Sequence, residues 1–336
     1  SNRSGQIHGR QWALTCPPVG SSSWPLLGIF MSASGQFFMS ADNAAVLFPN
    51  LAFIGPEVFY AAGPEYPEFR NVALRAYNDF ILEWASADPN RLLPLACIPY
   101  WNVKDAVAEI ERCAELGHRG LVTTGKPHIH GQPILADRHY DPMWAAAQDA
   151  GLSINFHVGG GRMEDFINEE RIATEKFRAM MMRTLTGSTF DSAHTLTDLL
   201  SSGVLSRFPD LKFVTSESAV GYIPFLLESL DYAFKKMEPW RERPDFQKDG
   251  MLPSDYFHRQ CYANFWYEKL TPWHVEKIGA DNLLWESDYP HQTCLIDDEV
   301  WDSVDYGIGD LSNEVREKVC WENAAQLYHV EIPAAV

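Results

Sequence analysis

The chain has 336 residues with a formal net charge of −18, and 46% of its residues are hydrophobic and 13% aromatic. This apolar content is enough for a large buried core, which excludes global disorder. The acidic excess repels phosphate backbones and anionic membranes, so we expect neither nucleic acid nor a membrane as a partner. The six cysteines share no Cys-x-x-Cys spacing, which favours free thiols and a cytoplasmic protein.

The first 43 residues are predicted to be irregular. They contain Pro17-Pro18 and three consecutive serines at 21–23, and they show no clear strand. The apolar stretch at 24–33 is broken by Pro25 and Gly28 and lacks a basic leader. A signal peptide is therefore the weaker alternative for this segment.

From residue 44 onward one unit recurs, namely a short apolar run, a loop and a helix with 3.6-residue periodicity. Seven such runs are predicted as strands. They cover residues 44–49, 91–99, 120–124, 152–157, 211–217, 262–267 and 282–288.

The helices between these strands have clear start and stop signals. Apolar residues at 69, 72, 76, 77, 80, 81 and 84 form one stripe, and a second helix begins after Asn102 and stops at Gly117. Asp141 and Thr271 each precede a proline, which predicts a cap followed by the first helical position. Further helices are predicted at 223–230 and 312–328.

Alternating strands and helices indicate a parallel α/β sheet, and this number of units favours a closed barrel. A doubly wound sheet stays the alternative, although no Gly-x-Gly-x-x-Gly follows the first strand. We expect residues 1–336 to form one domain, a (β/α)8 TIM barrel whose first strand is distorted within residues 1–43 or absent from the sequence. Residues 237–260 are a polar insertion, which suits a lid, an oligomer contact or a plain solvated loop.

Two strand ends carry candidate site residues. His157 ends an apolar run and is followed by Val158 and three glycines. Asp288 ends the last run, directly before Tyr289-Pro290. Barrels place metal ligands at such carboxyl ends. The alternatives are a structural histidine and a turn aspartate. Glu217, at the end of the run at 211–217, is either catalytic or a carboxylate that orients a ligand.

Other polar residues are candidates for substrate binding. His128 and His130 would reach one metal only from an extended strand, but Pro127 and Gly131 indicate a loop, so we expect them to line the pocket. Arg162 could bind a substrate carboxylate in a bidentate manner. His291 follows Pro290 and either braces the loop or contacts substrate.

Several segments, in this order, resemble the amidohydrolase 2 branch of the amidohydrolase-related superfamily, which includes enzymes similar to aminocarboxymuconate-semialdehyde decarboxylase. Each segment alone is weak, but the ordered set spans residues 44–329. The segments are 77–79, 88–92, 156–157, 202–213, 217–218 with 223–224, 253–257, 287–291 and 322–325.

The resemblance implies roles for three of these residues. His157 matches the metal-ligand histidine of the fifth strand, and Asp288 matches the aspartate of the eighth strand that ligates or abuts the metal and handles protons. Glu217 stands where many relatives have a histidine. The His-x-His or acidic-x-His motif of the first strand is not found in residues 1–43, whose single histidine, His8, is expected to be solvated.

We therefore predict an enzyme with one divalent metal ion, zinc rather than manganese, bound by His157 and Asp288, with Asp288, Glu217 and His291 as catalytic residues. The first prediction is a hydrolase acting on a small aromatic or conjugated acid. The alternatives are a decarboxylase on the same scaffold and a barrel that has lost its metal site and binds a partner. The resemblance also implies a homodimer.

Overall fold

In the computed structural model, the described residues are 34–36 (backbone only), 44–49, 55–61, 67–157, 168–237, 250–289, 291 and 293–330. The chain divides into two compact units, Ser1–Met31 and Ser32–Val336, and all described residues belong to the second. Predictions for His8, Arg162 and most of residues 1–43 lie outside the described residues.

The described strands form one sheet in sequence order. The first strand, β1 (Ser34–Gln36), pairs antiparallel with β2, and each later strand pairs parallel with the next. All seven predicted strands are confirmed, and the chain supplies β1 in addition. They are β2 (Ala45–Phe48), β3 (Leu92–Cys97), β4 (Gly120–Val122), β5 (Ile154–His157), β6 (Phe213–Ser216), β7 (Cys261–Phe265) and β8 (Leu283–Trp285).

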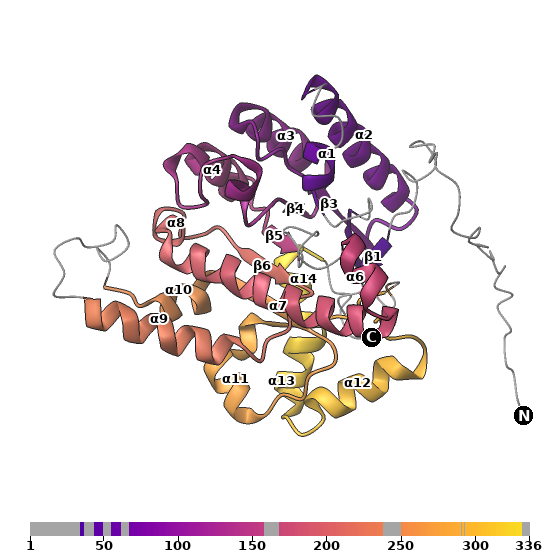
Figure 1. Ribbon diagram of the computed structural model, residues 1–336, viewed down its shortest axis with the longest axis vertical. Helices are drawn as coiled ribbons and strands as arrows, with labels where there is room; N and C mark the ends of the chain where they lie inside the picture. The colour runs from indigo at the N-terminus through magenta and orange to yellow at the C-terminus, as the bar shows by residue number, and fades with distance from the viewer. Residues whose placement is uncertain are drawn as a thin grey trace, which may run out of the picture. The chain divides into compact units, whose positions relative to one another are not determined.

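Helices lie between and around these strands (Figure 1). Short 3-10 helices cover Pro127–His130, Arg138–Tyr140 and Ala280–Asn282. The α-helices are α1 (Glu57–Ala61), α2 (Pro67–Ala85), α3 (Val103–Leu116), α4 (Asp141–Asp149), α6 (Glu169–Thr174), α7 (Phe177–Ser201), α8 (Val204–Arg207), α9 (Ile223–Met237), α10 (Pro253–Gln260), α11 (Pro272–Ile278), α12 (Asp298–Ile308), α13 (Asn313–Glu317) and α14 (Asn323–Leu327).

The sheet curls around a shared interior. Val46 of β2, Val214 of β6 and Leu284 of β8 belong to one core cluster with Tyr328, which follows α14. The neighbouring residues along the strands, such as Ile154, pack outward against the helices in a second cluster. This two-sided burial is that of an α/β barrel and agrees with the predicted fold. Among the described residues, the strand before β2 is antiparallel, which agrees with a distorted first strand.

The predicted helix boundaries hold where a capping group sets them. Asn102 accepts a hydrogen bond from the Asp105 backbone N–H, and Gly117 ends α3 in the left-handed conformation at φ 98°. Asp141, in contrast, is the first residue of α4 and not its cap. The closing helix is interrupted by a π-helix at Lys318–Glu322.

Two sequence predictions about packing need correction. In α2, Phe69, Val72 and Trp84 are exposed, because the core takes a narrower face centred on Tyr77 and Ile81. The insertion predicted at residues 237–260 includes α10, whose aromatic residues lie in the core. A lid or partner contact from this segment could therefore use only its earlier part, of which residues 238–249 lie outside the described residues.

A buried polar bridge joins α2, β3 and α3. The side chain of Asn78 binds both backbone groups of Cys97 and donates to Glu109 Oε1 at 2.9 Å, and Arg112 donates to the same carboxylate. Burial alone would raise the pKa of Glu109, but the hydrogen bonds from Arg112 and Asn78 lower it below the usual value. The charged carboxylate therefore stabilises the fold.

We expect Glu109→Gln to lower the free energy of unfolding at pH 7 by about 1–3 kcal/mol, because the charge-assisted hydrogen bonds are lost. A carboxylate with a lowered pKa contributes stability above its unfolded pKa, and this contribution is lost as pH falls through the folded pKa. The difference from wild type should thus shrink between about pH 5 and pH 3. Urea unfolding at pH 7 and at about pH 3 measures the difference in the free energy of unfolding. The control is Glu111→Gln, which changes an exposed residue on the same helix. Equal stabilities of the two variants at pH 7 would contradict this account.

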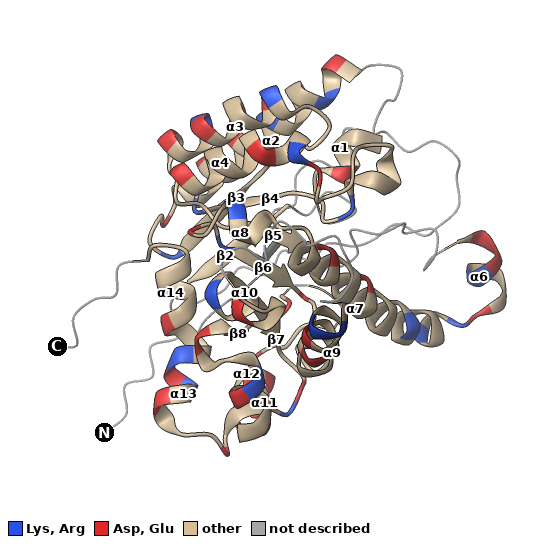
Figure 2. Cartoon of the chain, turned by 90° about the vertical axis from the view of Figure 1, so that its left-hand side faces the viewer, with Lys and Arg blue, Asp and Glu red and all other residues tan. Residues whose placement is uncertain are grey.

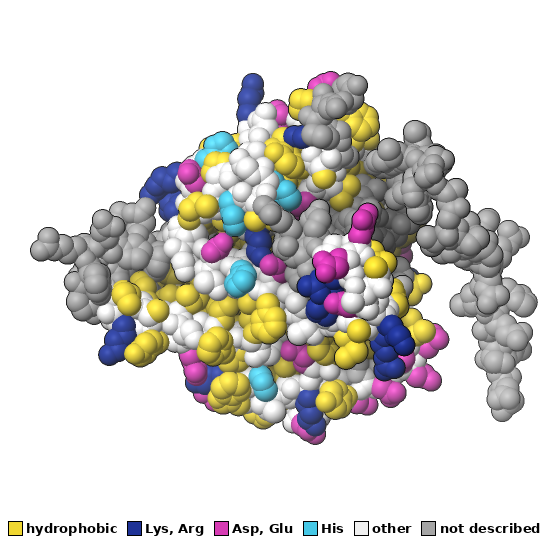
Figure 3. All heavy atoms as spheres, in the orientation of Figure 1, with side chains coloured by type: hydrophobic (Ala, Val, Ile, Leu, Met, Phe, Trp, Pro, Cys, Tyr) yellow, Lys and Arg dark blue, Asp and Glu magenta, His cyan; other side chains and the backbone are white. Residues whose placement is uncertain are grey.

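Basic and acidic residues are both distributed over the described helices (Figure 2). None of the described helices is long and apolar enough to cross a membrane. On the face in Figure 3, the Lys and Arg side chains of the described residues lie singly or beside Asp and Glu. The described cysteines are free thiols, and Cys97, Cys113 and Cys261 are buried.

Candidate metal centre and active site

Three strand ends bring four polar side chains to one mouth of the barrel. His157 is the last residue of β5, Glu217 directly follows β6, and Asp288 and His291 lie in the loop after β8. Carboxyl ends of parallel strands meet on one face of a barrel, so residues far apart in sequence become neighbours. The four residues singled out at strand ends and in the last loop are therefore brought together.

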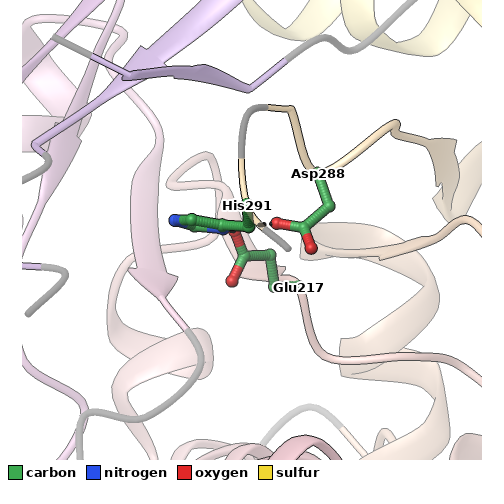
Figure 4. Close-up of side chains that lie close together, drawn as sticks. All are labelled: Glu217, Asp288 and His291. Carbon is green, nitrogen blue, oxygen red and sulfur yellow. Dashed lines mark hydrogen bonds and ion pairs between the residues drawn. The ribbon is translucent and has the colours of Figure 1, made fainter. Parts of the chain in front are cut away.

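Glu217 and Asp288 are the centres of the cluster (Figure 4). Glu217 Oε1 lies 3.3 Å from His157 Nε2 and 3.2 Å from His291 Nδ1. Asp288 Oδ1 lies 2.6 Å from His291 Nδ1, and Thr293 Oγ1 donates to Asp288 Oδ2 at 2.7 Å. Glu217 and Asp288 are buried, whereas the His291 side chain is 34% exposed.

The backbone at these strand ends is unusual. Glu217 has φ 51° and Asp288 has φ 59°, both in the left-handed region that non-glycine residues rarely adopt. Such conformations cost about 1–3 kcal/mol and occur at functional sites, where the surrounding fold enforces them. Here they end the strands and place both carboxylates next to the imidazoles.

The cluster shifts the pKa of each acid in a different direction. Burial alone would raise the pKa of Glu217, but the facing His157 and His291 lower it well below the usual value. Burial and the Glu217 charge raise the pKa of Asp288 to about 6, against the opposing effect of the His291 and Thr293 hydrogen bonds. Hydrogen bonds to Asp288 and Glu217 raise the pKa of His291 to about 10. The charged form of Glu217 is thus favoured, whereas Asp288 holds a proton more readily than an ordinary aspartate.

The donor set fits a divalent cation. One ligand atom from each of Glu217, Asp288 and His291 lies within 4.8 Å of the others, and His157 lies next to Glu217. Carboxylate and imidazole donors on a rigid strand-end scaffold suit manganese or zinc. Sequence reasoning did not include Glu217 and His291 among the metal ligands, but their positions also allow them to ligate a metal.

The two predicted substrate-binding histidines follow β4. They are in the 3-10 helix Pro127–His130 and not in an extended strand, so the predicted loop is confirmed. His128 is exposed, whereas His130 packs against the rings of Tyr60 and Tyr100, with centroids 5.6 Å away in both cases. Arg162 lies outside the described residues. His194 is exposed on α7.

Sequence reasoning missed one acid in the barrel interior. Glu286 is fully buried, and Asn264 donates to its carboxyl group at 2.9 Å. Burial and the neighbouring Glu217 charge raise the pKa of Glu286 well above the usual value. Its position was available from the alternation of side chains, since Glu286 and Asp288 are two apart and share the inward face.

We expect Glu217→Gln to lower the pKa of His291 from about 10. The amide removes one of the two negative charges that favour the imidazolium, while Asp288 keeps the pKa above the ordinary value. A proton NMR titration of the His291 ring in metal-free protein measures the change. An unchanged midpoint would show that Glu217 does not interact with His291.

Comparisons with known proteins agree with the family resemblance and the fold. The sequence profile of the family described as Amidohydrolase matches residues 38–330. Gamma-resorcylate decarboxylase from Polaromonas sp. (strain JS666) is 25% identical over 262 residues, covering 77% of this chain and 76% of that protein. The enzyme of the same name from Rhizobium sp. (strain MTP-10005) is 24% identical over 274 residues, covering 80% and 79%.

Solved structures share the same fold at lower identity. A dihydroxybenzoic acid decarboxylase from Polaromonas sp. JS666, with manganese and the inhibitor 2-nitroresorcinol bound, superposes with a TM-score of 0.59 at 22% identity, covering 78% of this chain and 76% of that one. The 5-carboxyvanillate decarboxylase of Sphingomonas paucimobilis gives 0.58 at 22% identity, covering 77% and 72%. The profile match spans most of the chain, which therefore belongs to the amidohydrolase family of enzymes.

Proposed function

We propose that the chain is a metal-dependent decarboxylase of a small aromatic acid that carries a hydroxyl group beside the carboxylate. The relatives that cover about three quarters of the chain are named as decarboxylases of such acids. They support the decarboxylase, which the sequence analysis gave as the alternative, over the hydrolase that it placed first. The residue roles below are part of the proposal.

The observation that carries the proposal is the pairing of Asp288 with His291 at 2.6 Å, with Glu217 Oε1 3.2 Å from the same imidazole nitrogen. Decarboxylation of an aromatic acid requires a proton on the ring carbon that bears the carboxylate. In this proposal Asp288 supplies the proton as a general acid. The bond to the carboxyl carbon then breaks, its electron pair returns to the ring, and carbon dioxide leaves.

A divalent cation, when bound, would polarise the carboxylate and the adjacent hydroxyl oxygen of the substrate. His157 and Asp288 are the proposed ligands, and Glu217 and His291 complete the set. We propose manganese as the ion, because two related structures contain it and because hard carboxylate oxygens suit it. The zinc predicted from the sequence has no such support.

The remaining assignments stay predictions. His130, among the aromatic side chains beside the mouth, is the better placed of the two predicted substrate-binding histidines, since His128 is exposed. Substrate binding by Arg162, a single domain over residues 1–336, a homodimer and a cytoplasmic location are likewise predicted.

Product analysis tests the proposed reaction. Manganese-loaded protein is incubated with hydroxybenzoic acids in water enriched in heavy oxygen. Carbon dioxide release, with a ring product that contains no oxygen from water, is the expected result. Oxygen from water in the ring product would favour hydrolysis, and the absence of both turnover and stoichiometric metal would favour a binding protein.

A further inference from the structure

The middle of α7 lies beside the metal-ligand candidate of β5. A small cavity between the ends of β5 and β6 and this helix is lined by His157, Asp191, Ser192, Thr195 and Thr215, among others. Its volume of about 10 Å³ is room for one water molecule. Among the residues that line this cavity, Asp191 of α7 is the one with a carboxylate.

The loop after β4 holds α7 in this position. A Cβ on Gly125 would lie 2.1 Å from Thr195 Cγ2, so the close approach of helix and loop requires a glycine. Next to it, Lys126 Nζ donates to Asp191 Oδ1, and the two side chains are only 10% and 18% exposed. The ion pair is buried and lies next to the close contact between Gly125 and Thr195. Together they fix the position of the Asp191 carboxylate.

One oxygen of this carboxylate is left without a donor. Asp191 Oδ2 is buried and has no hydrogen-bond partner among the described residues. Burying a carboxylate oxygen without a donor is costly, and ordered water commonly satisfies such atoms. The serine and threonine side chains that line the cavity can give a water molecule its further hydrogen bonds.

We propose that Asp191, paired with Lys126, holds a water molecule against His157 and so orients the imidazole for metal binding. Asp191 is a positioning residue in this scheme and does not touch the substrate. The inference rests on the proposed function to the extent that His157 is taken as a metal ligand. Metal-binding histidines generally need such a partner, and its loss costs about 10- to 100-fold in metal affinity.

Calorimetric titration of the full, metal-free chain with Mn²⁺ alone tests this role. We expect Asp191→Asn to raise the Kd for Mn²⁺ by about 10- to 100-fold. The matched control is Asp198→Asn, which removes the same charge from an exposed position on the same helix and should leave the Kd unchanged. A residue with only a structural role would lower the Tm of the variant and leave the Kd of the folded protein as it is.

A second pair of variants covers the case in which Asp191→Asn does not fold. Lys126→Gln should weaken Mn²⁺ binding, and Lys126→Arg, which keeps the charge, should retain it. If Asp191→Asn folds and binds Mn²⁺ with the Kd of wild type, the inference is overturned. If Asp191→Asn does not fold, a wild-type Kd in Lys126→Gln overturns it. A wild-type chain that binds Mn²⁺ but releases no carbon dioxide contradicts the proposed function and leaves the inference intact.

Discussion

Replacement of Asp288 by asparagine is expected to lower kcat for carbon dioxide release by roughly 10²- to 10⁴-fold, the range measured for lost general acid catalysis. The amide keeps the shape of the side chain and can still accept the Thr293 hydrogen bond. It cannot carry the proton that the ring carbon needs, and it is a weaker ligand for a cation. Steady-state kinetics with the preferred acid measures the loss.

The control for this variant is the same aspartate-to-asparagine substitution at a position away from the site. Asp302→Asn makes the same change on an exposed residue of α12 and should leave kcat unaltered. The Tm of Asp288→Asn shows whether the variant is folded. A folded Asp288→Asn protein with kcat within about threefold of wild type is incompatible with a general acid at this position.

Removal of the metal is expected to abolish turnover and to lower the stability of the protein. The four polar side chains at the mouth include two buried carboxylates whose mutual repulsion a bound cation would reduce. Manganese at 100 times its Kd should therefore add about 2.7 kcal/mol to the free energy of unfolding, as binding to the native state alone predicts. Chelation, a thermal melt and an assay before and after adding Mn²⁺ measure both effects.

His157→Ala is the matched variant for the metal experiment. We expect its melting curve to respond little to Mn²⁺, because the strand-end imidazole is missing while the rest of the barrel is intact. A chelated wild-type protein with full activity, or a His157→Ala protein that gains as much stability from Mn²⁺ as wild type, would exclude His157 as a ligand.

The sequence was sufficient for the barrel because its strands and helices carry strong local signals. Apolar runs of three to six residues form β2 to β8, and Asn102 and Gly117 bound α3 through local hydrogen bonds. The direction in which a helix faces the core depends on its neighbours. That is why the apolar stripe of α2 was predicted too wide, with Asn78 instead of Phe69 taking a place in the interior.

The site was predicted in part, for a related reason. Strand ends indicate which residues reach the mouth, and this was enough for His157, Glu217 and Asp288. The separations within the mouth depend on the curl of the sheet and on the backbone at φ 51° and 59°, neither of which a sequence pattern contains. The contribution of α7 through Asp191 depends on a glycine contact with a distant loop, which has no local signal.

The most direct measurement of the central claim is the turnover of a hydroxybenzoic acid by manganese-loaded protein in deuterated water, followed by NMR of the ring product. A decarboxylase delivers one solvent-derived hydron to the carbon that lost the carboxylate. We predict a single deuterium at that carbon and one carbon dioxide released per product. A product without deuterium at that position, or an acid recovered unchanged from protein with stoichiometric manganese, would contradict the account.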